Sequence, residues 1–265
     1  MKNLEMYCVT NKTLNFLDET SYKIAWVGQE KPPQNYISCD NGDNIFFKEK
    51  NYSELTFHYW FWKNKLDIKD KNWIGFCQKR RYWLKKNSEK SKVNRLNIKD
   101  HCLDDVPIEW SNYESILCEP IYVNKIKKMK LIKRGFKSLL KDPRIFFDNS
   151  KQSLLLHFNM HHGYGNIEKA IKHLNEKDQN EFFNYLNKST YYNPHIMFIA
   201  RPEIVDRWFN DLFKWLFKCE KTFGFENLQG YDTQRLYAYL AERYLSFWFK
   251  KYTKYTNWPW SFIET

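Results

Sequence analysis

The first half of the chain alternates short apolar runs with segments in which apolar residues recur every three or four positions. Residues 7–10, 24–27, 73–77 and 115–118 are runs of the length and composition that form buried strands. The turn-prone stretch 31–51 lies between the second of these strands and the first helical pattern. Strands that alternate with helices predict a largely parallel sheet.

The first helix is predicted to begin near Asn51. Residues 51–54 (Asn-Tyr-Ser-Glu) resemble a capping box, in which the first and fourth side chains satisfy backbone N–H groups at the helix start. Apolar residues from Leu55 to Trp62 then recur on one helix face. Beyond the third strand, the polar and charged segment 86–99 is expected to be a mobile loop or insertion.

The second half of the chain is predicted to be mostly helical. Residues 196–200 form one more apolar run of strand type. We predict a single α/β domain over residues 1–265, with an α/β part (1–150) and a helix-rich part (151–265). The helical periodicity covers 152–160, 166–174, 179–186, 202–223 and a last helix that Asp232 or Thr233 caps and that runs to about 250.

The net charge adds an expectation about partners. The 265 residues carry a formal net charge of +12, which favours an anionic partner such as nucleic acid, a nucleotide diphosphate or an acidic membrane face. The basic stretch 125–134 and the aromatic tail 248–260 could rest on anionic lipids. The alternatives are a solvated basic helix and a tail that packs back on the domain.

The cysteines and the apolar runs bear on the compartment. The six cysteines form no Cys-x-x-Cys pair and match no zinc-binding spacing, so we expect buried free thiols in a reducing cytoplasm. The sequence has no signal-peptide pattern at its start and no run of about 20 apolar residues. A cytoplasmic location is therefore expected, with peripheral contact at the inner membrane face as a further hypothesis.

Arg80 and Arg81 form the first candidate site, because they directly follow the predicted strand 73–77. In open α/β sheets, ligands bind beyond the carboxyl ends of the strands. Guanidinium groups at that place can bind phosphate oxygens with two parallel hydrogen bonds. The alternative interpretation is a solvated basic turn.

Residues 40–44 (Asp-Asn-Gly-Asp-Asn) form a second candidate, either a surface turn or a loop whose carboxylate and amide groups contact a sugar or ribose. They do not fit a calcium-binding EF-hand loop, because Asn51 occupies the position where the twelfth-residue carboxylate belongs.

The adjacent histidines His161 and His162 stand beside a glycine-bounded loop. One of them could act as a ligand or a base, although neighbours on a helix cannot both point toward one metal ion. In the last helix, Arg235 and Glu242 are seven residues apart, with Asp232 one turn earlier. They could carry chemistry, or they could form a buried pair that locks the helix to the sheet.

Five blocks of the sequence resemble a bacterial family of capsular-polysaccharide-synthesis glycosyltransferases that was long catalogued as a domain of unknown function. The resemblance runs from about residue 7 to 250. Its blocks are residues 40–45, Glu54-Leu55-Thr56 with Tyr59-Trp60 and Trp62-Lys63-Asn64, Gly75-Phe76 with Arg80-Arg81-Tyr82, Met197-Phe198-Ile199, and Arg235 with Leu240-Ala241-Glu242-Arg243 and Trp248.

The resemblance implies a GT-A-like fold, with a mixed, mainly parallel sheet flanked by helices, and sugar transfer from a nucleotide-diphosphate donor. Some members of the family are thought to use a UDP-galactofuranose type of donor. Two departures bear on the sugar. Where the family often has His-Tyr before the two arginines, this chain has Gln78-Lys79. Where it often has Asn before Met-Phe-Ile, this chain has Ile196, and the neighbouring His195 could substitute.

The metal ligands of many GT-A enzymes are missing from the expected place. Those enzymes hold a divalent ion through an Asp-x-Asp motif at a strand end, whereas the comparable strand here ends in Lys79, Arg80 and Arg81. The close acidic pair Asp104-Asp105 lies in a less strand-like place. We therefore expect no cofactor, or a weakly required Mn²⁺ or Mg²⁺, with fixed cations stabilising the leaving diphosphate.

The resemblance implies an inverting hexosyltransferase whose acceptor is a lipid-linked capsular or lipopolysaccharide oligosaccharide. The resemblance and the patterns together then suggest a role for each candidate residue.

A nucleic-acid-binding module and a polysaccharide-modifying phosphotransferase are the competing classes. The sequence has no zinc knuckle or RNA-binding signature and no acidic metal cluster, so nucleic acid is not expected as a partner. The donor-binding candidates are Gly28, Asp40, Asn41, Asn44, Glu54, Lys79, Arg80 and Arg81, the candidate bases are Glu242, Asp232 and His161, and the acceptor-binding candidates are His162, His195 and Arg235.

Overall fold

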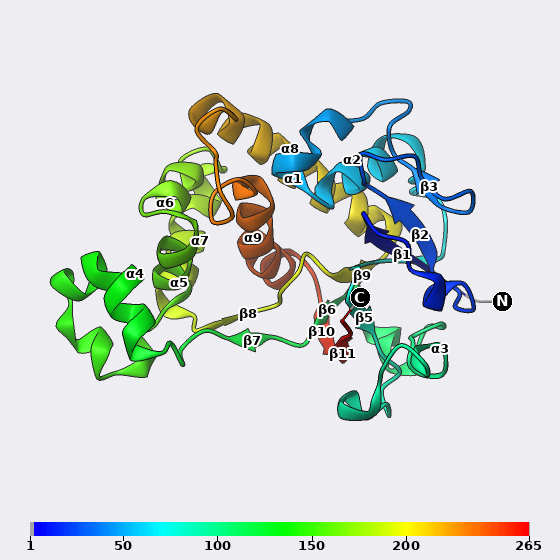
Figure 1. Cartoon of the computed structure of the whole chain (residues 1–265), viewed down its shortest axis with the longest axis horizontal. Coiled ribbons are helices and arrows are strands. Elements are labelled where there is room, and N and C mark those ends of the chain that lie inside the picture. The colour runs from blue at the N-terminus through cyan, green and yellow to red at the C-terminus, as the bar shows by residue number, and fades with distance from the viewer. Residues whose placement is uncertain (1–2, 265) are drawn as a thin grey trace. The chain divides into compact units, whose positions relative to one another are not determined.

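The computed structural model describes residues 3–264, which form two compact units (Figure 1). Unit 1 contains residues up to 119 together with 195–211 and the segment from 248 onward. Unit 2 contains 120–194 and 212–247. The units are thus interleaved along the chain, whereas the parts expected from the sequence, 1–150 and 151–265, are consecutive. That the whole chain is one glycosyltransferase domain stays a prediction.

Unit 1 is built on a mixed sheet whose main path runs β10-β6-β9-β4-β1-β2-β3. All neighbours on this path are parallel except β9, which is antiparallel to both β4 and β6. The predicted mainly parallel sheet is therefore confirmed. The strands are β1 (Leu4–Thr10), β2 (Lys23–Trp26), β3 (Ile37–Ser38), β4 (Trp73–Gln78), β6 (Ser115–Cys118), β9 (Phe198–Ala200) and β10 (Tyr255–Trp258), with β5 (Arg81–Trp83) and β11 (Trp260–Phe262) paired beside β4.

The sheet of unit 1 is covered on both faces because its strands alternate large apolar side chains. Tyr7 packs against Phe61 at 4.8 Å and Phe76 at 5.8 Å between ring centroids, which fixes α2 (Leu55–Asn64) on one face. On the other face Cys8 and Cys77 join a cluster with Tyr82, Trp83 and Trp110. Helix α8 (Pro202–Phe223) begins in unit 1, and α9 (Leu236–Tyr252) ends in it.

The predicted capping box at 51–54 is wrong. Helix α1 (Glu49–Tyr52) ends before Ser53, whose φ of 54° no α-helix accommodates. A new helix, α2, follows with Glu54 as its N-cap, and no side chain caps it. His58 on α2 is a core residue, and burial lowers its pKa to about 3. The His58 imidazole is therefore neutral inside the aromatic cluster.

Buried side chains anchor the charged segment 86–99 and the aromatic tail to unit 1, whereas the sequence predicted a mobile loop or insertion at 86–99. Segment 86–99 includes η3 (Lys90–Lys92) and the start of α3 (Ile98–His101), and Val93 and Ile98 are buried. Trp258 is buried and its indole N–H donates to the Leu84 carbonyl at 2.9 Å. Trp258 therefore packs on unit 1, which agrees with the alternative that the tail packs back on the domain. The remaining short helices of this unit are η1 (Asn15–Leu17), η2 (Phe46–Lys48) and η4 (Ile108–Asn112).

Unit 2 is helical apart from a short antiparallel pair, β7 (Ile121–Tyr122) and β8 (Tyr191–Tyr192). The helices predicted near 152–160, 166–174 and 179–186 are confirmed. Ser153 caps α5 by accepting from the Leu156 N–H at 3.3 Å, and Gly163, with φ of 93°, ends it. The helices are α4 (Lys128–Lys141), η5 (Pro143–Phe146), η6 (Asn149–Lys151), α5 (Leu154–His162), α6 (Asn166–Ile171) and α7 (Glu176–Lys188), together with the C-terminal part of α8 and the N-terminal part of α9.

All six cysteines are free and buried, as the sequence predicted. Across residues 3–264, none of the helices combines the length and the apolar character that crossing a lipid bilayer requires.

Candidate functional site

The carboxyl ends of the parallel strands bring several predicted donor-binding residues to one edge of the unit 1 sheet. β1 and β4 are in register with Val9 opposite Gln78, and β1 and β2 with Thr10 opposite Trp26. Because β9 is antiparallel to β4, the segment that precedes β9 reaches this same edge. The candidates that lie within three residues of these strand ends are Gly28, Lys79, Arg80 and His195.

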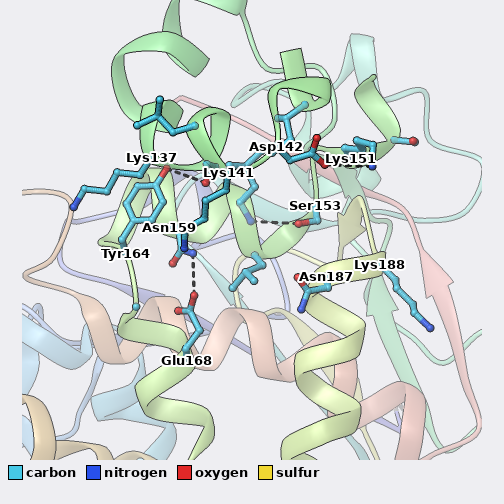
Figure 2. Close-up of a pocket in the computed structure, with 17 residues that line it drawn as sticks. Lys137, Lys141, Asp142, Lys151, Ser153, Asn159, Tyr164, Glu168, Asn187 and Lys188 are labelled. Atoms are coloured by element: carbon cyan, nitrogen blue, oxygen red, sulfur yellow. Dashed lines mark hydrogen bonds and ion pairs between the residues drawn. The ribbon is translucent and has the colours of Figure 1, made fainter. Parts of the chain in front are cut away.

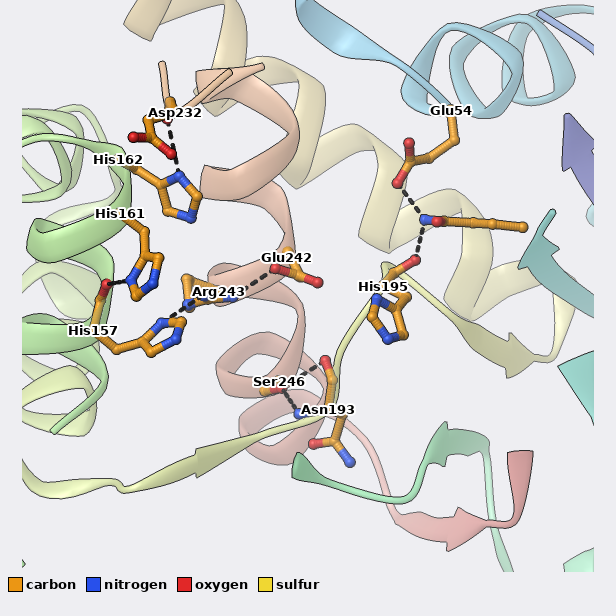
Figure 3. Close-up of polar contacts among 11 residues, drawn as sticks. Glu54, His157, His161, His162, Asn193, His195, Asp232, Glu242, Arg243 and Ser246 are labelled. Carbon is orange, nitrogen blue, oxygen red and sulfur yellow. Dashed lines mark hydrogen bonds and ion pairs between the residues drawn. The ribbon is translucent and has the colours of Figure 1, made fainter. Parts of the chain in front are cut away.

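Gln78, the last residue of β4, links two of the candidates at this edge. Its side-chain Nε2 donates to the Glu54 carboxylate and to the backbone carbonyl of His195 (Figure 3). His195 and Ile196 have φ values of 70° and 52°, a conformation that costs free energy for residues other than glycine. The chain therefore turns sharply before β9, and the His195 ring packs edge-on against Trp260 at 5.0 Å.

Lys79 and Arg80 give the edge its positive charge. The Lys79 ammonium donates to the Asn11 side-chain oxygen, beyond the end of β1. Arg80 has φ of 74°, and its backbone is held on both sides, since its N–H donates to the Tyr82 hydroxyl at 3.0 Å and its carbonyl accepts from Ile263 at 2.8 Å. Among the described residues, its buried Nε has no hydrogen-bond partner. The Arg80 backbone is thus held in a strained conformation, and the Arg80 guanidinium has an N–H donor without a partner among the described residues.

Arg81 differs from the prediction, because it is the first residue of β5 and does not belong to the turn. It lies opposite Phe262 in the register of β5 and β11, with its guanidinium 5.6 Å from the centroid of the Phe262 ring. The Arg80 guanidinium lies 5.7 Å from the same ring. One aromatic side chain therefore supports both arginines through cation–π contact.

The loop 40–44 is fastened to α2 by the residues that make up the family-like signature. Trp60 donates to the Asn41 side-chain oxygen at 3.1 Å, and Tyr59 donates to the Asp43 carboxylate at 3.2 Å. Asn64 bonds the Asp43 backbone through both its side-chain oxygen and its side-chain nitrogen. Holding the loop in place is therefore enough to explain the presence of these residues, without a direct contact to a ligand.

The donor-binding candidates in and near this loop differ in their exposure and in how many hydrogen bonds they already make. Asn44 accepts from the Phe46 N–H at 3.1 Å and donates to the Gly42 carbonyl at 3.0 Å. Asp40 is exposed and accepts from the Ser38 hydroxyl. Gly28 is buried, and a Cβ there would lie 2.6 Å from the Trp26 ring, so only glycine fits without a shift.

A second polar cluster lies wholly within unit 2, centred on the buried side chain of Arg243 (Figure 3). Its guanidinium donates to the Glu242 carboxylate at 2.6 Å and to Nδ1 of His157 at 3.2 Å. It also lies 3.8 Å from the centroid of the Tyr192 ring. Burial and the Arg243 charge lower the pKa of His157 to about 2, so this imidazole is neutral and accepts at Nδ1.

His161 and His162 have a defined tautomer because each bonds a backbone carbonyl through Nδ1. The carbonyl is that of His157 at 2.8 Å for His161, and that of Asp232 at 3.0 Å for His162. A carbonyl only accepts, so Nδ1 carries the proton and Nε2 keeps a lone pair. Burial lowers the pKa of both rings, to about 4 for His162, which also stacks on Tyr239 at 3.7 Å. Both are neutral potential bases at neutral pH.

The structure contradicts the alternative in which Arg235 and Glu242 form a buried pair. Arg235 is exposed and precedes α9, and Glu242 pairs with its neighbour Arg243. Asp232 is half-exposed and lies 3.2 Å from the Arg134 guanidinium. Seven-residue spacing does place two positions on one face, but α9 begins only at Leu236, so Arg235 is outside it.

Sequence reasoning missed Gln78, His157 and Arg243 as members of these clusters. Arg243 belonged to the Leu-Ala-Glu-Arg block, which was a usable signal, and Gln78 stands where the family-like pattern often has histidine. His157 gave no signal, because its partner is 86 positions away in the sequence.

Candidate metal ligands do not gather at the sheet edge. Within residues 3–264, no group of three or more histidine, cysteine, aspartate or glutamate side chains is arranged to hold a metal ion. Asp104 is engaged by Lys85 at 3.5 Å, and Asp105 accepts from the Val106 N–H at 2.8 Å. The donor set at the end of β4 is cationic and does not fit a divalent ion.

Comparisons with known proteins agree with the fold described above. The family described as "Domain of unknown function (DUF4422)" matches residues 5–254. No curated protein matches the sequence. The chain is similar to a solved structure titled "WbbM bifunctional glycosytransferase apo structure", with a TM-score of 0.71 and 20% identity over 99% of this chain. This chain spans 45% of that longer protein. The mixed α/β, GT-A-like fold predicted from the sequence is thereby confirmed.

Proposed function

We propose that this chain, which belongs to the DUF4422 family, is a glycosyltransferase that moves a sugar from a nucleotide-diphosphate donor to a growing capsular or lipo-oligosaccharide acceptor. The observation that carries the proposal is the position of Lys79 and Arg80. Two cations directly follow β4, at the edge of the sheet where α/β proteins bind nucleotides. The fold likeness to a glycosyltransferase supports the same reaction class.

Unit 1 is proposed to bind the donor through its diphosphate. The Arg80 guanidinium offers N–H donors in a fixed fork, and Lys79 offers a compact charge held by Asn11. When the bond between the sugar and the diphosphate breaks, negative charge collects on the leaving phosphate oxygens. Fixed cations aimed at those oxygens stabilise the transition state without rearranging. Lys79 and Arg80 are proposed to do this in place of a divalent metal.

The remaining donor-side residues are proposed to position the nucleotide and the sugar. Gly28 is proposed to lie beside the donor beyond the end of β2, where the Trp26 ring occupies the space that a side chain would need. Glu54, held by Gln78, presents a carboxylate of the kind that accepts from sugar hydroxyl groups. Asp40 is proposed for the ribose. The sequence resemblance supports a UDP-linked donor, and the donor proposed is of the UDP-galactofuranose type.

Inverting transfer requires a base that removes the proton from the acceptor hydroxyl as the new bond forms. Of the three candidates, Glu242 is engaged by Arg243 and Asp232 by Arg134. His161 keeps the Nε2 lone pair and is partly exposed. We therefore favour His161 as the base, with His162 and Arg235 proposed for acceptor binding.

A lipid-linked acceptor at the cytoplasmic membrane face is consistent with the surface of α4. Met129, Ile132, Phe136 and Leu140 are exposed, and their spacing of three or four residues puts them on one side of the helix. Every charged residue of α4 is Lys or Arg. An apolar stripe beside basic side chains is the pattern of helices that lie in the interface of anionic membranes. We propose peripheral membrane contact through this stripe.

The experiment that tests the reaction class is a thermal-shift screen of nucleotides and nucleotide sugars. Ligands that bind only the native state raise the melting temperature. A shift with UDP or UDP-sugars that other nucleotides do not match supports the proposal. A chain that responds to none of them, and that binds nonspecific DNA with strong salt dependence, would instead be a nucleic-acid-binding protein.

A further inference from the structure

A large cavity lies within unit 2, and its lining does not include His157, Glu242 or Arg243 of the polar cluster described above. Its volume is about 1080 Å³, and Figure 2 shows polar side chains pointing into it. Ligand sites in proteins typically enclose roughly 300–1,000 Å³, so there is room for more than one sugar ring. The lining residues come from α4, η5, η6, α5, the start of α6 and the end of α7.

Two side chains that line this cavity each hold an acceptor atom without a donor among the described residues. Asn159 is 92% buried (8% exposed), and its side-chain nitrogen donates to Oε1 of Glu168 at 3.1 Å. The Asn159 Oδ1 and the Glu168 Oε2 are buried, and among the described residues neither accepts a hydrogen bond. Buried acceptors without partners are costly, so this pair calls for hydroxyl or N–H groups from a ligand.

Lysines dominate the charge around the cavity. Lys137, Lys141, Lys151 and Lys188 line it, against the carboxylates of Asp142 and Glu168. Asp142 is already neutralised, because Arg144 bonds it at 2.7 Å and Lys151 lies 3.4 Å away. These bonds, the one from Arg144 first, lower the pKa of Asp142 to about 2. The charge left over is positive.

The apolar part of the lining suits the carbon face of a sugar. Leu140, Ile145, Leu155 and Leu156 contribute hydrocarbon, and Tyr164 contributes a ring whose hydroxyl is tied to Ser138 at 3.1 Å. A ligand that combines hydroxyl donors, negative charge and apolar C–H faces matches all three parts of the lining.

We propose that this cavity binds an anionic saccharide, whose hydroxyl groups donate to Asn159 and Glu168 and whose phosphate or carboxylate groups lie against Lys141 and Lys188. Its assignment as the acceptor glycan of the transfer reaction rests on the proposed function. Binding itself does not depend on that reaction. Phosphate in a glycosyl phosphate and carboxylate in a uronic acid are two sources of the same negative charge.

The test is calorimetric titration of the full chain with hexose 1-phosphates (glucose, galactose and N-acetylglucosamine) and with glucuronic acid, each in saturating UDP. Inorganic phosphate and methyl glucoside serve as probes that carry only charge or only hydroxyls. We expect at least one anionic sugar to bind more tightly than inorganic phosphate and than methyl glucoside. Tighter binding of a hexose 1-phosphate identifies phosphate as the recognised anion, and tighter binding of glucuronic acid identifies carboxylate. No binding by any anionic sugar at millimolar concentration would overturn the proposal.

Two variants assign that binding to the cavity. Glu168→Gln keeps the shape but removes the free carboxylate oxygen, so the sugar should bind about tenfold more weakly while inorganic phosphate is unchanged. Lys141→Ala with Lys188→Ala should weaken both. Glu176→Gln, on exposed α7 surface outside the cavity, is the matched control. Unchanged sugar binding in Glu168→Gln would contradict the proposal, whatever the transfer assay shows, and retained cavity binding without glycosyl transfer would refute only the proposed function.

Discussion

The side-chain amide of Gln78 joins Glu54 to the carbonyl of His195, and so fastens the start of α2 to the strained turn before β9 at the carboxyl edge of the sheet. Three segments that are far apart in the sequence are held by one nitrogen. Neither the Glu54 carboxylate nor the His195 backbone is near β4 in the chain, so this link is made only on folding.

Replacing Gln78 with glutamate should destabilise the protein. The amide donor becomes a carboxylate that faces another carboxylate and a carbonyl, so two hydrogen bonds are lost and repulsion is added. We expect a loss of about 2–4 kcal/mol in the free energy of unfolding by urea titration at neutral pH. At low pH, where both carboxyl groups are protonated, the loss should shrink. Equal stability of the variant and the wild type at neutral pH would remove Gln78 from its proposed linking role.

The neutral state of His157 predicts a pH dependence of stability. The folded-state pKa of His157 is about 2 and its ordinary value is 6.5, so below pH 6.5 the unfolded chain takes up a proton that the native state refuses. Stability is therefore full above pH 6.5 and falls as the pH decreases toward the folded pKa. Each such histidine contributes about 1.4 kcal/mol per pH unit in that window.

The variant His157→Asn isolates this contribution, because the asparagine oxygen can still accept from Arg243 but does not titrate. Its free energy of unfolding should fall less steeply between about pH 6 and pH 4, by about 1.4 kcal/mol per pH unit. His58→Gln, which removes a fully buried imidazole from unit 1, should flatten the curve similarly. Parallel pH profiles for wild type and His157→Asn would show that His157 titrates normally.

The α4 stripe should bind anionic vesicles. Cosedimentation with phosphatidylglycerol vesicles should exceed that with phosphatidylcholine vesicles and should weaken as salt increases. Ile132→Ser with Phe136→Ser should reduce binding several-fold, since each exposed apolar side chain contributes about 1 kcal/mol or more on burial in lipid. Phe47→Ser, at an exposed position of unit 1, is the control and should bind like wild type. Loss of binding in the control alone would disprove the assignment to α4.

Transfer activity should persist without free divalent metal. Lys79 and Arg80 occupy the place where an acidic metal motif would stand, so removal of metal by EDTA should change the rate by less than about tenfold. The matched measurement adds Mn²⁺ or Mg²⁺ back to the treated enzyme. Strict dependence on either ion would contradict the role proposed for the two cations.

Helices and strands could be predicted from the sequence wherever the spacing or length of the apolar runs distinguishes them. The helix from Pro202 to Phe223 is an example, because its apolar residues recur at helical spacing, and the short apolar run that ends near Gln78 has the length of a strand. Ser53 was misread, since a positive φ at a serine is imposed by tertiary packing and leaves no mark in composition.

The candidate site was predictable only in part. That Lys79 and Arg80 follow a strand end could be read directly from residue order. The link through Gln78, the pairing of Arg243 with His157 and the interleaving of the two units depend on contacts between distant segments. A single sequence does not specify such contacts through periodicity or spacing.

The proposed role of Arg80 is tested most directly by calorimetric titration of UDP into wild type, Arg80→Ala and Arg95→Ala, an exposed arginine elsewhere in unit 1. We expect wild type and Arg95→Ala to bind UDP alike. Arg80→Ala should fold with an unchanged melting temperature and should bind UDP about 10- to 100-fold more weakly, because charge-assisted hydrogen bonds to phosphate are lost. Equal UDP affinity in Arg80→Ala and wild type would contradict the proposed role of Arg80.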